Sequence, residues 1–134
     1  MPTKFHGLLE FILVAMLRKL GLDAVAKVTV RLSPSKFLVP DVIAAPVLQS
    51  PYPTDPVLLC CEILSPEDRL GAILARCEEY HAWGVRFRWV IDPVKRTAWE
   101  YHSAMEPERV TGILRAGEIS ANLEELFSAL DTAH

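Results

Sequence analysis

The spacing of apolar residues changes several times along this chain, and each change predicts a different element. Apolar residues recur at helical spacing over 5–21, which predicts a helix that Gly21 ends. From 24 to 32 apolar and polar residues alternate, which indicates a half-buried strand. A second strand is expected over 37–44, paired with the first as a hairpin and made irregular by Pro40.

The middle of the chain predicts a loop, a buried strand and a second helix. Four prolines mark 46–56 as a loop. The nearly continuous apolar run over 57–64 is typical of a strand covered on both faces. The next helix is expected over 66–82, with Ser65 as its N-cap and Gly84 placed to end it.

Alternation returns in the last third of the chain. The stretches 85–91 and 97–102 each predict a strand, and weaker strand signals follow near 109–114. A short last helix is expected over 122–130, opening at Asn122. The predicted order is helix, three strands, helix and strand, with a further strand and helix appended. This order indicates an α/β (α+β) fold in which helices flank both faces of a mixed sheet.

Size and composition fit one compact domain. The chain has 134 residues, of which 51% are hydrophobic, so a single domain over 1–134 with a buried core is expected. The apolar run over 8–17 is too short for a membrane span, which needs roughly 20 residues. The three cysteines are an odd number and two of them are adjacent, which predicts buried thiols that stay reduced in the cytoplasm.

The charge balance limits which partners are expected. The chain has 17 acids and 14 bases, and its net charge of −3 excludes a strongly basic protein that binds nucleic acid without specificity. A local basic surface is still compatible with this balance. Arg69, Arg76, Arg86 and Arg88 are expected to concentrate positive charge near the second helix and the next strand. DNA binding through them would weaken steeply as salt rises.

Two of the predicted strands carry an acid among apolar residues, Asp41 in the second and Glu62 in the third. A buried, ionised carboxylate costs several kcal/mol unless a partner compensates it. If the strands are neighbours, the two acids can share a divalent cation, and oxygen ligands of this kind suit Mg²⁺ or Mn²⁺. In the structural alternative, Glu62 pairs with Arg76 or Arg88, and Asp41 ends its strand at solvent.

Arg76 and Ser65 also allow two interpretations. Arg76 borders the buried face of the second helix, from which it can supply positive charge beside a scissile phosphate. The alternative is a surface arginine whose stem covers the core. Ser65 is better explained as a helix cap than as a nucleophile, because no histidine lies near it in sequence to activate it.

Three stretches of the chain resemble a known family. The strings VPDVIAA, DPVLLCCEILSPEDR and CEEYHAWGVRFRWVIDPVKRTAWEY occur in the order seen in the restriction endonuclease family called Uma-two. This family is a branch of the PD-(D/E)XK nuclease superfamily, and the similarity runs from about His6 to the final helix. The resemblance implies an αβββαβ core and a Mg²⁺-dependent endonuclease acting on DNA. It implies that Asp41 and Glu62 are the metal ligands, with Arg76 as a third catalytic residue.

The chain departs from the family pattern in two ways. The superfamily usually has a lysine two residues after the glutamate, where this chain has Leu64, and the family usually has a lysine on the next helix, where this chain has Arg76. The chain also begins close to the position matching His6, so the domain is expected to be shortened at its N-terminus. A second hypothesis is therefore a catalytically weakened relative that binds DNA or protein. The apolar first helix and the tryptophans also suggest a homodimer.

Overall fold

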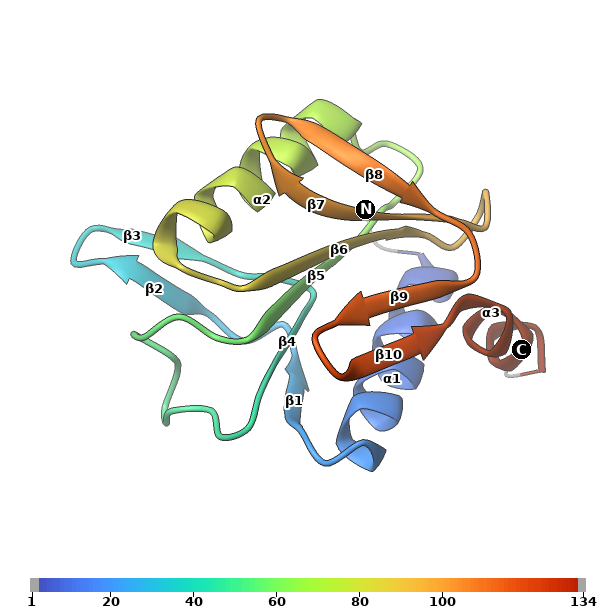
Figure 1. The fold of residues 1–134 in the computed structure, drawn as a ribbon, viewed down its shortest axis with the longest axis horizontal. Helices are drawn as coiled ribbons and strands as arrows, with labels where there is room; N and C mark the ends of the chain where they lie inside the picture. Colours follow the sequence, from blue (N-terminus) through green and yellow to red (C-terminus); the bar gives the residue numbers. More distant parts are fainter. Residues whose placement is uncertain (1–2, 133–134) are drawn as a thin grey trace.

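A six-stranded mixed sheet forms the centre of the computed structural model, which describes residues 3–132 (Figure 1). The strands are β1 (Asp23–Ala26), β4 (Val42–Ala45), β5 (Leu59–Ile63), β6 (Phe87–Asp92), β7 (Thr97–Ser103) and β8 (Glu106–Val110). They lie side by side in the order β1-β4-β5-β6-β7-β8. β5 and β6 run parallel, and the other neighbouring pairs are antiparallel.

Within the described residues, three helices and two small hairpins accompany this sheet. The helices are α1 (Lys4–Lys19), α2 (Leu70–Trp83) and α3 (Leu123–Thr132). The hairpins are β2 (Val30–Ser33) with β3 (Lys36–Leu38), and β9 (Ile113–Ala116) with β10 (Ile119–Asn122). α1, α3 and β9–β10 cover one face of the sheet, while α2 and β2–β3 cover the other (Figure 1). α2 is the crossover that joins the parallel strands β5 and β6.

The core beneath α1 follows from its sequence spacing. Leu9, Leu13 and Leu17 are four residues apart, so they share one side of the helix, and all three are fully buried against the sheet. Trp89 of β6 joins the same cluster, and its indole N–H donates to the Arg115 carbonyl at 3.0 Å. This bond gives the indole N–H, which burial removes from water, a hydrogen-bond partner.

The predicted fold class is confirmed, and the three cysteines are buried and free as expected. Burial raises the pKa of all three thiols, Cys60, Cys61 and Cys77, which keeps them protonated and unreactive. No helix within residues 3–132 is long and apolar enough to cross a membrane. The predicted domain over 1–134 includes residues 1–2 and 133–134, which lie outside the described residues.

The strand expected over 24–32 is two strands, which is a correction to the sequence prediction. β1 pairs with β4 in the main sheet, whereas β2 pairs with β3 in a separate hairpin. The break begins at Lys27, whose φ of 56° lies in the left-handed region that interrupts a strand. The partner stretch 37–44 also divides, because Pro40 separates β3 from β4.

The second helix begins later than predicted. Residues 65–68 form a turn, in which the Ser65 amide donates to the Asp68 carboxylate at 2.7 Å and the Asp68 amide donates to the Ser65 carbonyl at 2.9 Å. α2 therefore starts at Leu70, and Ser65 does not cap it. Its predicted end is confirmed, since Gly84 takes a left-handed conformation with φ 117°.

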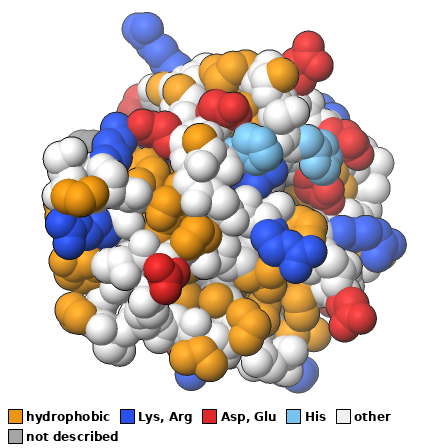
Figure 2. Space-filling view, turned by 60° about the vertical axis from the view of Figure 1, so that its left-hand side comes forward, with side chains coloured by type: hydrophobic (Ala, Val, Ile, Leu, Met, Phe, Trp, Pro, Cys, Tyr) orange, Lys and Arg blue, Asp and Glu red, His pale blue; other side chains and the backbone are white. Residues whose placement is uncertain are grey.

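The predicted basic surface does not form, which is a second correction. Arg88 is only 5% exposed, and its guanidinium donates to the carbonyls of Val85, Tyr101 and His102 inside the protein. Arg69 and Arg86 flank opposite ends of α2, which is about 21 Å long at 1.5 Å per residue. Figure 2 shows basic side chains scattered among acidic and hydrophobic ones on the face that carries α2 and β2–β3.

Candidate active site

Asp41 lies between β3 and β4, where the chain enters the main sheet beside the end of β5. It is 9% exposed, and its Oδ2 atom accepts the Ile63 amide at 2.7 Å. Ile63 directly follows Glu62, so this bond holds the Asp41 carboxylate next to the strand that carries Glu62. The alternative in which Asp41 ends a strand at solvent is wrong.

Glu62 lies in β5 and is 2% exposed. Its Oε1 atom accepts the Tyr80 hydroxyl at 2.6 Å and lies 3.2 Å from Nη2 of Arg76. Arg76 also donates to the Val39 carbonyl at 2.9 Å, which anchors α2 to the strand segment before Asp41. All three predicted site residues therefore meet. The Glu62–Arg76 ion pair of the structural alternative is also present, whereas a Glu62–Arg88 pair is not formed.

Three further polar residues lie at Asp41, and the sequence did not indicate any of them as candidates. His6 and Glu10 project from the first turns of α1, and Lys27 follows β1. The Lys27 ammonium lies 2.8 Å from Asp41 Oδ1 and 2.9 Å from Glu10 Oε2. His6 Nε2 is 3.4 Å from Asp41 Oδ1, and its Nδ1 is 3.5 Å from Glu10 Oε1. One candidate ligand atom from each of His6, Glu10 and Asp41 lies within 4.8 Å of the other two.

The two acids have opposite electrostatic environments. Burial alone would raise the pKa of Asp41, but hydrogen bonds from His6, Lys27 and Ile63 outweigh it and hold the pKa well below its usual range. Burial raises the pKa of Glu62 to about 8; the charges of Arg76 and Asp41 act on it in opposite directions, Arg76 lowering the pKa and Asp41 raising it. A protein without added cations therefore keeps Asp41 ionised, whereas Glu62 holds a proton more tightly than a free glutamate does.

Three buried polar atoms among the described residues of this site lack hydrogen bonds. They are His6 Nδ1, Glu10 Oε2 and Arg76 Nε, although Glu10 Oε2 lies within ion-pair distance of Lys27. Buried polar atoms usually have partners, and an ion is one explanation when they do not. The combination of carboxylate oxygens, an imidazole and a raised glutamate pKa fits a divalent cation, which would favour the charged form of each acid.

The missed residues carried only weak signals. His6 and Glu10 are four residues apart, which places two polar side chains on one side of a largely apolar helix. Lys27 looked like an ordinary solvent-facing position of an alternating strand. Tyr80 counted as part of the apolar face of α2, although it lies one helical turn after Arg76.

A family model for Uma2, described as "Putative restriction endonuclease", matches residues 1–131. The chain belongs to this family. The crystal structure of a "putative nuclease belonging to DUF820" from Anabaena variabilis shares the fold, with a TM-score of 0.80 and 18% sequence identity. The match covers 97% of this chain and 84% of that one. No curated protein matches the chain. Membership of this family supports a nuclease function in general terms. Such a function implies a nucleic-acid substrate and a need for a divalent metal.

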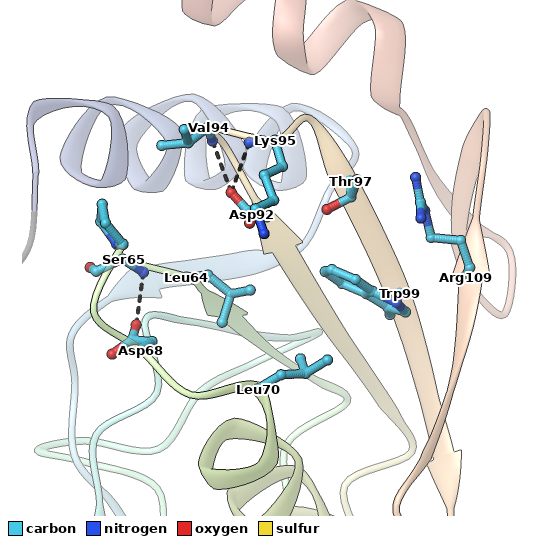
Figure 3. Close-up of a pocket in the computed structure, with 11 residues that line it drawn as sticks. Leu64, Ser65, Asp68, Leu70, Asp92, Val94, Lys95, Thr97, Trp99 and Arg109 are labelled. Atoms are coloured by element: carbon cyan, nitrogen blue, oxygen red, sulfur yellow. Dashed lines mark hydrogen bonds between the residues drawn. The ribbon is translucent and has the colours of Figure 1, made fainter.

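This Uma2 chain has a groove of about 580 Å³ that begins directly beyond β5 (Figure 3). Its walls come from the β5–α2 connection, the β6–β7 turn, β7 and β8. The residues that line it are Leu64, Ser65, Pro66, Asp68, Leu70, Asp92, Val94, Lys95, Thr97, Trp99 and Arg109. Leu64 is two residues after Glu62 on the same strand path, but Asp41, Glu62 and Arg76 are not among the residues that line the groove.

The groove combines an apolar floor with two cations. Its acids are occupied, since Asp92 accepts the Val94 and Lys95 amides at 3.0 Å and Asp68 accepts the Ser65 amide. The Arg109 guanidinium lies 5.9 Å from the centre of the Trp99 ring. The Thr97 hydroxyl is buried without a hydrogen-bond partner, and in Figure 3 it points toward the side where Asp92 and Lys95 lie. These groups can bind a phosphate and a flat apolar ring.

Proposed function

We propose that this protein is a metal-dependent endonuclease that hydrolyses DNA phosphodiester bonds. The observation that carries the proposal is the pair of buried carboxylates, Asp41 and Glu62, brought together from neighbouring parts of the sheet. Two buried carboxylates are costly unless partners compensate them, and a divalent cation that both acids share would add to the compensation that their partners in the chain give. Membership of the Uma2 family supports the same chemistry.

Asp41 and Glu62 would hold Mg²⁺ or Mn²⁺, and the ion when bound supplies a polarised phosphate and an activated water. Arg76 is placed to orient the substrate, because its guanidinium already lies 3.2 Å from Glu62 and can stabilise charge that develops on the phosphate. Arginine keeps its proton at neutral pH, so Arg76 acts through charge and not as a base. The Tyr80 hydroxyl, which donates to Glu62, fixes the orientation of that carboxylate.

The proposal is tested with purified protein and supercoiled plasmid DNA. Nicking is expected with Mg²⁺ or Mn²⁺ and is expected to stop when EDTA is added. An identically purified Asp41→Asn protein controls for contaminating nuclease. Nicking that continues in EDTA, or that the variant retains, would contradict the proposed hydrolysis.

We further propose that the groove holds DNA beside the cleaved bond. Replacing Lys95 and Arg109 by alanine is expected to weaken DNA binding about tenfold near 0.1 M salt and to lower the slope of log affinity against log salt by about 2, because two phosphate contacts are lost. Fluorescence anisotropy with a labelled duplex measures both quantities. Lys36→Ala is the matched control, since Lys36 lies in β3, outside the groove, and pairs with Glu79 at 2.8 Å. If the salt slope of the double variant were unchanged, the groove would not be part of the surface that binds DNA.

One observation favours the second hypothesis, a weakened nuclease that binds DNA without cutting it. Each acid is already paired with a cation of the chain, Asp41 with Lys27 and Glu62 with Arg76. DNA binding by wild-type protein with no nicking in either metal would support this role.

Two broader expectations remain proposals. A homodimer is one of them, and sedimentation measurements of the mass in solution test it; Phe11 on α1 is 73% exposed, but a single exposed apolar side chain does not define an interface. A cytoplasmic location is supported by the three free cysteines.

A further inference from the structure

We infer that Lys27 is a tethered counter-ion that occupies the cation position between Asp41 and Glu10, and that a divalent metal ion binds this site by displacing it. The inference rests on the proposed function; it adds Glu10 and His6 to the ligands of the ion beside Asp41, and it adds a residue that competes with the metal. Its first support is geometric. One ammonium group contacts two carboxylates, at 2.8 Å and 2.9 Å, in the same cluster whose ligand atoms lie within 4.8 Å of each other.

The ammonium only partly satisfies the site. His6 is 3% exposed, and its Nδ1 atom has no hydrogen-bond partner. Glu10 Oε2 lies close to the ammonium but without the angle of a hydrogen bond. Lys27 forms no hydrogen bond with His6 Nδ1, which lies 3.5 Å from Glu10 Oε1. The two carboxylates and His6 together present more possible ligand atoms than one ammonium contacts. A cation that accepts nitrogen and oxygen ligands uses this set more fully, which favours Mn²⁺ over Mg²⁺ as the probe.

The backbone directs Lys27 into the cluster. Its amide donates to the Asp41 carbonyl at 3.0 Å, so the main chains of the two residues are tied together. Its φ of 56° is a backbone angle that residues other than glycine rarely adopt. This turn ends β1 and aims the side chain at the carboxylates of residues that lie 17 positions before and 14 positions after it along the chain.

Exposure makes displacement feasible. The Lys27 side chain is 47% exposed, whereas the side chains of Asp41 and Glu10 are 12% and 10% exposed. The lysine therefore covers the acids from the solvent side, and its flexible stem allows the ammonium to move out without any change in the sheet. Two cations bound to the same carboxylate oxygen would repel each other at short range, so the metal and the bound ammonium exclude each other.

The test measures Mn²⁺ binding to the full chain by calorimetry and by electron paramagnetic resonance of the free ion. Lys27→Met is expected to bind Mn²⁺ at least about tenfold more tightly than wild type, because a positive charge beside the ion is gone. Lys27→Arg keeps the charge and is expected to bind like wild type. Lys36→Met is the matched control, since Lys36 is 48% exposed and also forms a carboxylate pair. Lys27→Gln replaces the methionine variant if that protein does not fold.

The outcomes separate this inference from the proposed hydrolysis. If the wild type binds Mn²⁺ and Lys27→Met binds it equally or more weakly, the role of Lys27 is overturned and the metal site still stands. Binding by Lys27→Met alone would support the role of Lys27 while contradicting a working nuclease in the wild type. Absence of Mn²⁺ binding in both proteins would overturn both.

Discussion

Replacing Asp41 by asparagine is expected to abolish metal binding and metal-dependent DNA cleavage together. Asparagine keeps the oxygen that accepts the Ile63 amide at 2.7 Å, so the local backbone is expected to persist. It removes the charge that faces Lys27, His6 and any bound cation. Metal ions contribute several kcal/mol to stabilising charge in a transition state, so a loss of about 10³-fold or more in cleavage rate is expected.

Plasmid nicking and Mn²⁺ calorimetry measure the two effects on the same protein preparation. Asp23→Asn is the matched control, because Asp23 also accepts a backbone amide, that of Leu48 at 3.0 Å, but lies at the other end of β1. Circular dichroism spectra check that each variant is folded. If folded Asp41→Asn protein still cleaved DNA at the wild-type rate, Asp41 would not be a metal ligand.

Glu62→Gln is expected to stabilise the metal-free protein, and increasingly so as the pH rises. Burial raises the pKa of Glu62 from 4.5 to about 8, so the folded state holds this proton more tightly than the unfolded state. The stability that Glu62 contributes is therefore fully present below pH 4.5 and is lost as the pH rises to about 8. Glutamine cannot ionise, and it still accepts the Tyr80 hydroxyl, so it avoids this loss.

The expected gain at pH 9 relative to pH 5 is on the order of 1–4 kcal/mol, reduced by the loss of the Arg76 partner. Urea unfolding in EDTA at pH 5, 7 and 9 measures it. Glu78→Gln is the control, because Glu78 also accepts a tyrosine hydroxyl, that of Tyr101 at 2.7 Å, but lies in a less buried place. A stability difference for Glu62→Gln that does not change with pH would mean that Glu62 stays ionised in its pair with Arg76.

The sequence predicted those parts of the site that follow from local pattern. An acid inside an apolar strand is visible in the string itself, so Asp41 and Glu62 could be named as candidates, and the spacing of α2 put Arg76 at the border of its buried face. The structure brings Arg76 within 3.2 Å of Glu62. The element order also followed from local periodicity, which gave the mixed sheet with helices on both faces.

The parts that were missed depend on contacts between distant segments. His6 and Glu10 join the candidate site only because α1 packs on one face of the sheet with its first turns beside Asp41, and no local pattern encodes that placement. The sequence places Arg88 at a polar position of an alternating strand, where exposure is expected. It is buried because three backbone carbonyls accept hydrogen bonds from its guanidinium and offset the loss of water. Lys27 breaks a strand whose residue types favour continuation, so the tertiary bond to Asp41 outweighs local preference.

The three buried thiols can report when the centre of this protein opens to solvent. Cys60, Cys61 and Cys77 are each no more than 1% exposed, and they lie in β5 and α2 on the path of the central crossover. A reagent such as iodoacetamide can reach them only when these elements separate, so the rate of alkylation follows opening of the central layer and not motion of the surface. Mass spectrometry after timed exposure can therefore compare the wild type with every variant, without a label or an added tag.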